Sequence, residues 1–245
     1  DEGFTSYAED VVLQRVLPKF KPYAGSYRSY YKLVESGKQE PLTTHADHYK
    51  TNRAYGTASY SMGLIFCHQL GYIVGEEVLL KGMKRYFNEW KYKHPTPNDF
   101  VRIIEKESGL ELDWYLEQWI ESTNTIDYGI KWIQEQEGST ILTLEKIGEF
   151  PMPLDLLITY KSGKEEWINI PTRIMRGSKS KESHMDSFEI KEDWPWTFSE
   201  YELKLNAKLN EIESIEIDPS ERMADINREN NSYPKDKSKT FKALD

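Results

Sequence analysis

The spacing of apolar residues changes near Ser122, and this change constrains the fold more than any other feature of the chain. Before it, bulky side chains recur three to five positions apart, as at Tyr7, Val11 and Val16. That spacing gives a helix one apolar face. After it, apolar and polar residues alternate, as they do in half-buried strands. Because one pattern cannot serve both structures, we expect a helical part followed by a β part.

The two patterns predict an α+β, multi-domain chain. We place a helical domain at residues 1–123, a second domain at 124–222 and a polar tail at 223–245. About seven short strands separated by turns, with no helical stretch between them, favour an antiparallel β-sandwich for the second domain. The helices are predicted over 2–17, 23–34, 60–70, 78–90, 97–108 and 113–120, and residues 37–57 are predicted as an ordered loop.

Composition excludes several classes of protein. The 245 residues carry a net charge of −9, which argues against a general nucleic-acid binder. The longest mostly apolar stretch, 64–75, is too short to span a bilayer, so we expect a soluble protein, either cytoplasmic or exported. One cysteine, Cys67, excludes an internal disulfide framework. Neither a methionine nor a signal peptide precedes Asp1, so we expect the chain to be part of a longer protein.

A few groups of residues have the chemistry of a functional site. His45, Asp47 and His48 lie close together in sequence and include metal-ligand types, but without a fourth ligand the favoured interpretation is a solvated polar loop. Glu2 and Glu9 are seven residues apart, which on a helix places both carboxylates on one face. Taken alone, that pair also fits an acidic stripe facing solvent.

Two motifs resemble those of the gluzincin zinc aminopeptidases, the aminopeptidase N family. Residues 1–9 read Asp-Glu-Gly-Phe-Thr-Ser-Tyr-Ala-Glu, similar to the family's Asn-Glu-Gly-Phe/His segment that continues to Tyr-x-Glu. Residues 55–63 read Tyr-Gly-Thr-Ala-Ser-Tyr-Ser-Met-Gly, similar to the family's Tyr-x-x-x-x-Tyr-x-Lys-Gly element. The order and separation of the motifs over residues 1–120 also agree with the family.

The resemblance assigns roles to four residues. Glu2 matches the third zinc ligand and Tyr60 the catalytic tyrosine, with Tyr55 as its supporting tyrosine. Glu9 would orient a metal ligand or its helix. The implied fold is the α-helical C-terminal lobe of a thermolysin-like catalytic domain, followed by a β-sandwich. The implied activity is removal of N-terminal residues from peptides by zinc-activated water, with Tyr60 stabilising the oxyanion.

The sequence departs from the family in four places. Asp1 replaces the usual Asn and Met62 the usual Lys. The His-Glu-x-x-His motif, which supplies two histidine ligands and the general base, does not occur in the chain, and neither does the Gly-x-Met-Glu-Asn segment that binds the substrate's amino terminus. We expect both upstream of Asp1. The chain alone is therefore predicted to lack Zn²⁺ and peptidase activity.

A second hypothesis comes from a different class of protein. In that hypothesis the chain is a noncatalytic scaffold of helices and a β-sandwich that binds protein or glycan. An upstream sequence without His-Glu-x-x-His would favour the scaffold, whereas an intact motif would favour the enzyme.

Overall fold

The computed structural model describes residues 2–17 and 19–235. The chain divides into two compact units, which are described separately. The helical unit contains residues 1–72, 76–107 and 112–124, and the β-rich unit contains 73–75, 108–111 and 125–245. Asp1, Pro18 and residues 236–245 lie outside the described residues. The α+β class predicted from the two sequence patterns is confirmed.

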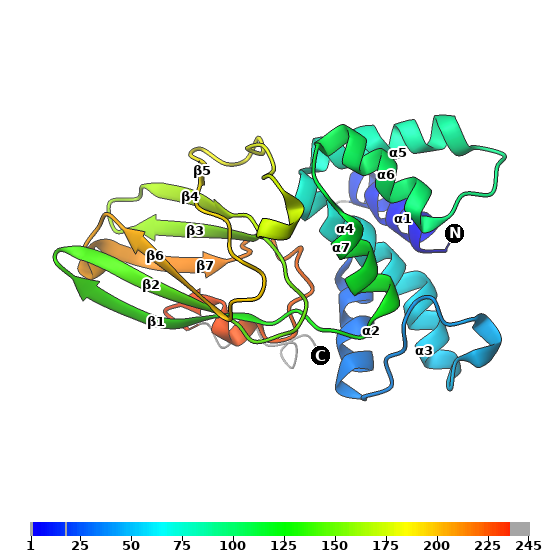
Figure 1. Cartoon of the computed structure of the whole chain (residues 1–245), viewed down its shortest axis with the longest axis horizontal. Coiled ribbons are helices and arrows are strands. Elements are labelled where there is room, and N and C mark those ends of the chain that lie inside the picture. The colour runs from blue at the N-terminus through cyan, green and yellow to red at the C-terminus, as the bar shows by residue number, and fades with distance from the viewer. Residues whose placement is uncertain (1, 18, 236–245) are drawn as a thin grey trace. The chain divides into compact units, whose positions relative to one another are not determined.

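The helical unit is built from helices joined by short connections (Figure 1). No described helix has the length and apolar character needed to cross a membrane. In chain order the helices are α1 (Glu2–Val16), α2 (Ala24–Glu35), η1 (Ala46–His48), α3 (Asn52–Gly56), η2 (Thr57–Met62), α4 (Gly63–Val74), α5 (Glu76–Trp90), α6 (Pro97–Ser108), α7 (Asp113–Leu116) and η3 (Glu117–Glu121).

The helix that carries the tyrosine motif is longer than predicted. It begins at Asn52, because the Thr51 hydroxyl accepts a hydrogen bond from the Ala54 N–H at 3.1 Å and so caps the helix. Helical backbone then continues through α3, the π-helical segment η2 and α4 to Val74. The predicted loop over 37–57 therefore ends six residues too late. The break predicted over Gly71–Gly75 is confined to Gly75, whose φ of +90° suits glycine.

Aromatic side chains fill the core of the helical unit. On α2, Tyr27, Tyr30 and Tyr31 are all buried. Two tyrosines connect neighbouring helices by hydrogen bonds in addition to apolar packing. Tyr7 donates to the Glu76 carboxylate at 3.3 Å, and Tyr115 donates to the Phe66 carbonyl at 2.9 Å. Burial raises the pKa of both phenols, so they stay neutral donors at physiological pH.

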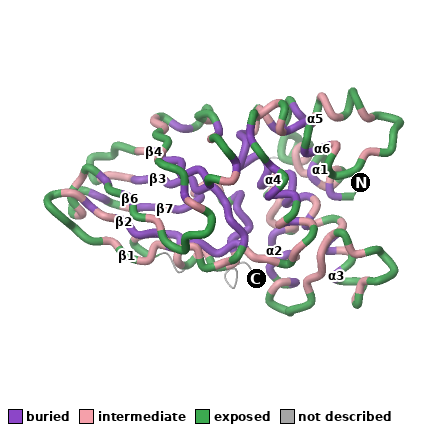
Figure 2. The backbone as a smooth tube through the Cα atoms, viewed as in Figure 1, coloured by how far each residue is buried: buried purple, intermediate pink, exposed green. Residues whose placement is uncertain are grey.

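The β-rich unit contains two sheets. One has the order β1-β2-β6 and the other β5-β4-β3-β7-β8. Alternate residues of their central strands are buried, including Leu142 and Leu144 of β2 and Leu154, Leu156 and Ile158 of β3 (Figure 2). The strands are β1 (Tyr128–Gln136), β2 (Ser139–Lys146), β3 (Leu154–Tyr160), β4 (Glu165–Ile170), β5 (Glu189–Ile190), β6 (Glu200–Leu205), β7 (Ile212–Ile217) and β8 (Ser232–Tyr233), with short helices η4 (Arg173–Met175), η5 (Leu209–Glu211) and η6 (Arg228–Asn230) between them.

Two details of the β-rich unit differ from the sequence prediction. β5 pairs with β4 in parallel, so the second sheet is mixed rather than antiparallel. The segment after residue 222, predicted as a polar tail, is structured as far as residue 235. Asp225 is buried and accepts a hydrogen bond from the Tyr128 N–H at 3.0 Å, and β8 pairs with β7. The Asp225 carboxylate therefore satisfies a buried backbone group instead of facing solvent. The rest of the predicted tail, 236–245, lies outside the described residues.

A buried ionic network fixes the segment that follows β4 and η4. Lys179 contacts Asp155 of β3 at 2.6 Å and Glu182 at 2.8 Å, and Arg222 contacts Glu182 at 2.6 Å. The side chain of Glu182 is 11% exposed. Burial alone would raise the pKa of Glu182, but Arg222 and Lys179 outweigh that effect and lower it to about 2. The ionised carboxylate therefore stabilises the folded unit.

This network predicts acid sensitivity. Because the folded pKa of Glu182 lies below the ordinary value of 4.5, its contribution to stability is complete above about pH 4.5 and is lost as the pH falls toward 2. The loss should approach about 3 kcal/mol for this one group. Glu182→Gln should lower stability at pH 7 and flatten the pH dependence between pH 4.5 and 2. Urea titrations at several pH values, together with hydrogen exchange of the β3 amides, would measure the free energy of unfolding.

A matched control is Glu202→Gln, because Glu202 is an exposed residue of β6. It should leave the pH profile of unfolding unchanged. If the Glu182→Gln and wild-type profiles run parallel between pH 4.5 and 2, the network does not cause the acid sensitivity.

Candidate active site

The helical unit contains an open cavity of about 620 Å³ that both sequence motifs help to line. The first motif contributes Glu2, Gly3 and Phe4 from the start of α1. Glu2 lies in the first turn, where the positive end of the helix dipole favours a carboxylate. The second motif contributes residues from α3 to the start of α4, namely Tyr55, Ala58, Ser59 and Gly63. Two motifs more than fifty residues apart therefore form one site.

The backbones of the two motifs touch at a pair of glycines. A β-carbon added to Gly3 would lie 2.5 Å from the Gly63 α-carbon, and one added to Gly63 would lie 2.8 Å from the Gly3 α-carbon. Real β-carbons do not approach backbone so closely, so any side chain at either position would force the helices apart. Gly3 directly follows Glu2, and Gly63 is three residues after Tyr60. The glycine contact therefore sets how near the carboxylate and the tyrosine helix can come.

A π-helical segment shapes the backbone around Tyr60. The helix widens over η2 and returns to α-helical geometry at Gly63. The indole N–H of Trp119, from the second π-helical segment η3, donates to the Met62 carbonyl at 2.9 Å. Short π-helical insertions are rare and are frequent at functional sites. The Trp119 hydrogen bond stabilises this one where the helix passes Gly3.

The two motif tyrosines occupy different surroundings. Tyr55 lines the cavity and packs against Tyr49, with ring centroids 5.5 Å apart. Tyr49 is held by a hydrogen bond from its hydroxyl to the Pro41 carbonyl at 3.1 Å. Tyr60 is 53% exposed and is not among the residues that line the cavity. The structure thus brings Tyr55 and Glu2 to one cavity and leaves Tyr60 on the surface of the same helix.

The first 119 residues match a known family. They match the family model described as Peptidase family M1 domain over residues 1–119. The matched segment covers just under half of the 245 residues. The resemblance to zinc aminopeptidases that the motifs at Glu2 and Tyr60 indicated is therefore confirmed at the level of the family. The match ends just before the apolar pattern changes to alternation.

One solved structure extends the similarity to both units. It is the Legionella pneumophila aminopeptidase A in complex with aspartic acid, with a TM-score of 0.55 and 13% sequence identity. The alignment covers 91% of this chain and 23% of that chain. At this identity the likeness concerns the fold alone, and the chain spans about a quarter of that protein's length. The comparison with curated proteins gives no match.

The described part of the chain does not contain a complete metal site. Among residues 2–17 and 19–235, no group of three His, Cys, Asp or Glu side chains is arranged to hold a metal ion. Glu9 is exposed and does not line the cavity with Glu2. In the 45–48 loop, His45 lies 3.8 Å from the Asp47 carboxylate and its ring 5.4 Å from that of His48, but these exposed groups form no metal site.

An aromatic wall beside Glu2 was not predicted as part of the site. Phe4, Tyr86 and Phe100 pack together, with ring centroids 4.8 to 5.8 Å apart, and all three line the cavity. Each of the three lies on the apolar face of a different helix, which in sequence indicates core packing. Nothing in the sequence shows that they meet beside Glu2. The wall gives the cavity an apolar side next to a carboxylate.

Polar residues of the α5–α6 connection also line the cavity. Lys93, His94 and Thr96 face it from a connection that the sequence did not mark as functional. Cys67 lines it as well, but burial raises the pKa of its thiol to about 12. A neutral, buried thiol is a poor nucleophile. This agrees with the structural role that its helical position indicates.

The glycine contact predicts a large difference between two alanine substitutions in one continuous helix. Gly63→Ala places a methyl group against the backbone of α1 and should destabilise the helical unit by at least about 2 kcal/mol. Gly56→Ala is the matched control, because Gly56 has helical backbone and open space around it. It should stabilise the unit by about 0.5 to 1 kcal/mol. Thermal or urea unfolding measures both, and equal effects of the two substitutions would contradict the contact.

Proposed function

We propose that this chain is the C-terminal part of a zinc-dependent aminopeptidase that removes N-terminal residues from peptides. The observation that carries the proposal is the shared cavity, where the motif carboxylate Glu2 and the motif tyrosine Tyr55 come together beside the Gly3 and Gly63 contact. The family match over residues 1–119 supports the same reading.

The donor chemistry at Glu2 fits a zinc ligand. Carboxylates, imidazoles and thiolates are the groups that bind zinc in proteins, and catalytic sites commonly combine two histidines with one glutamate. Glu2 supplies one such carboxylate in the first turn of α1. Among the described residues, no two further ligands lie beside it. The remaining ligands would come from a His-Glu-x-x-His helix. When bound, zinc supplies a Lewis acid that activates water at neutral pH.

The chain's own residues then have distinct tasks. Glu2 binds the metal and partly neutralises its charge. The phenol of Tyr60 donates a hydrogen bond to the substrate oxygen on which negative charge develops. Tyr55, held by Tyr49, limits how the tyrosine helix can move. Glu9, two turns along α1 from Glu2, orients the metal ligands or the helix.

The exposure of Tyr60 is compatible with this catalytic role. A phenol that must reach a substrate cannot be enclosed in the core, and Tyr60 is 53% exposed while Tyr7, Tyr30 and Tyr115 are at most 1% exposed. The exposed ring sits on the π-helical segment, whose carbonyl at Met62 is fixed by Trp119. Its backbone is held in place while its hydroxyl stays accessible.

Removal of the phenol hydroxyl is the direct kinetic test. The experiment uses the longer gene product that contains this chain together with a His-Glu-x-x-His helix. Tyr60→Phe should lower kcat for an aminoacyl chromogenic substrate about 10²- to 10³-fold, the effect of losing one oxyanion donor, while zinc content is unchanged. Glu2→Gln should lose zinc as well as activity. The chain alone should hold no zinc and cleave nothing.

The matched control is Tyr92→Phe. Tyr92 is fully exposed and lies outside the cavity, so this substitution should change neither zinc content nor turnover. Unchanged turnover in Tyr60→Phe would remove that residue from the mechanism. Full zinc occupancy in Glu2→Gln would remove Glu2 from the metal site.

A further inference from the structure

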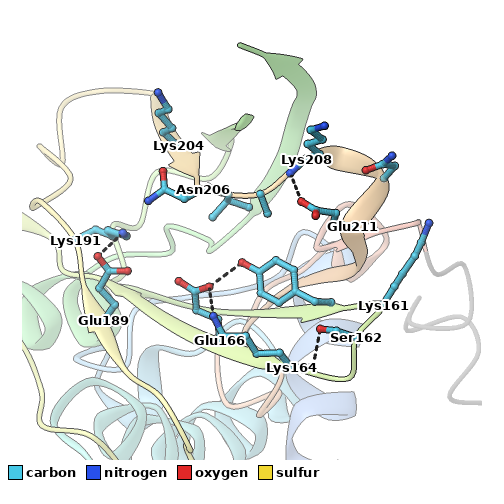
Figure 3. A pocket seen from close by; sticks show the side chains of 14 residues that line it. Lys161, Ser162, Lys164, Glu166, Glu189, Lys191, Lys204, Asn206, Lys208 and Glu211 are labelled. Carbon is cyan, nitrogen blue, oxygen red and sulfur yellow. Dashed lines mark hydrogen bonds and ion pairs between the residues drawn. The ribbon is translucent and has the colours of Figure 1, made fainter. Parts of the chain in front are cut away.

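The β-rich unit has an open cleft of its own, with a volume of about 730 Å³. Its walls come from the β3–β4 turn, β4, β5, the end of β6 and the connection from β6 to β7 (Figure 3). None of its residues lines the cavity around Glu2, so it is a separate site. No role predicted from the sequence involves it.

Five lysines line this cleft, which we call the lysine cleft: Lys161, Lys164, Lys191, Lys204 and Lys208. Three glutamates, Glu166, Glu189 and Glu211, are also present, which leaves the lining with a net charge of +2 in a chain whose net charge is −9. Such a reversal of sign concentrates anionic ligands at one place on an acidic surface.

Three of the lysines are available to a ligand. Lys164 is engaged by Glu166 at 3.8 Å and Lys191 by Glu189. Within the described residues, Lys161, Lys204 and Lys208 form no ion pair, and in Figure 3 no dashed line reaches their ammonium groups. All three are exposed and come from two separate connections and the end of β6. They therefore present spaced positive charges along the cleft.

The types of charged side chain in the cleft favour a ligand with spaced carboxylates over a single phosphate. The described lining contains no arginine, the side chain that holds phosphate with two parallel hydrogen bonds. The three glutamates would repel a dense polyphosphate. Asn206 and Asn210 add amide groups that can bind neutral polar atoms between the charges.

One edge of β6 is open for backbone pairing. In the described chain β6 pairs with β2 alone. The Lys146 N–H donates to the Ser199 carbonyl, and in an antiparallel pair such residues alternate along the strand. Tyr201 and Leu203 therefore direct their backbone groups toward β2, while Glu202 and Lys204 direct theirs away from it. The free edge leads into the cleft at Lys204.

We propose that the lysine cleft binds an extended acidic polypeptide segment that pairs with the free edge of β6. Backbone hydrogen bonds at Glu202 and Lys204 would align the segment. Its carboxylates would then meet Lys161, Lys204 and Lys208. This binding is independent of the peptidase site, because the two sites share no residue.

The test measures fluorescence anisotropy with three probes at 50 mM NaCl. The first is a labelled 12-residue peptide of alternating Glu and Thr, the second its Lys and Thr counterpart, and the third is tripolyphosphate as a competitor. The cleft variant combines Lys161→Gln, Lys204→Gln and Lys208→Gln. The control combines Lys38→Gln, Lys84→Gln and Lys106→Gln, three exposed lysines of the helical unit with the same change in net charge.

The acidic peptide should bind and the basic one should not. The cleft variant should bind the acidic peptide about tenfold more weakly, as expected for the loss of three exposed charge contacts, and the control within twofold of wild type. Binding should weaken at 500 mM NaCl, because salt screens exposed charges.

Backbone pairing has its own pair of variants. Glu202→Pro removes an outward N–H without touching the β2 ladder, as edge strands tolerate. It should weaken binding even though it removes a negative charge, whereas Glu202→Gln should not. If Glu202→Pro fails to fold, hydrogen exchange replaces it, and the Glu202 and Lys204 amides of the wild type should exchange more slowly with the peptide bound.

Four results would overturn the proposal. One is no binding of the acidic peptide. Another is equal weakening by the cleft and control variants, which would mean attraction to charge in general. A third is that tripolyphosphate competes as strongly as unlabelled peptide, while Glu202→Pro does not weaken binding and the Glu202 and Lys204 amides do not exchange more slowly. That result would mean a simple anion site. The last is self-association of the cleft variant with unchanged peptide binding, which would mean that these lysines only protect an exposed edge.

Discussion

The contact between Gly3 and Gly63 is the constraint on which the candidate site depends. Each residue lies where any side chain would strike the other's backbone. The contact joins the start of α1 to the point where the tyrosine helix returns from π-helical to α-helical geometry. Glu2 directly precedes Gly3, and Tyr60 lies three residues before Gly63. Both motifs include a glycine for a physical reason, because a wider approach would separate the carboxylate from the tyrosine helix.

The remaining features of the helical unit reinforce this junction. Trp119 holds the Met62 carbonyl next to it, Tyr49 packs on Tyr55, and the wall of Phe4, Tyr86 and Phe100 fills the space beside Glu2. The buried residues Tyr7 and Tyr115 serve as neutral hydrogen-bond donors in the core, whereas the ring of Tyr60 is exposed. The β-rich unit uses a different device, the buried network around Glu182, to hold a segment with little regular structure.

Local sequence patterns predicted most elements of this fold but few of its long-range contacts. The helical spacing around Tyr27 and the alternation along β3 act over neighbouring residues, and both predictions hold. The structure of 223–235 was missed because Asp225 is satisfied by Tyr128, almost a hundred residues away. The roles of Glu2 and Tyr60 came from motifs, whereas the cavity that Glu2 shares with Tyr55, Lys93 and His94 depends on tertiary packing that no local pattern contains.

The central claim is that Glu2 and Tyr60 serve one zinc site. Anomalous X-ray diffraction at the zinc edge, on crystals of a protein in which this chain follows a His-Glu-x-x-His helix, tests it most directly. The account predicts a zinc peak about 2.0 to 2.2 Å from a Glu2 carboxylate oxygen, with the Tyr60 hydroxyl facing the same space. A fully occupied zinc whose ligands do not include Glu2, or a Tyr60 hydroxyl turned away from the metal in a complex with a substrate analogue, would contradict it.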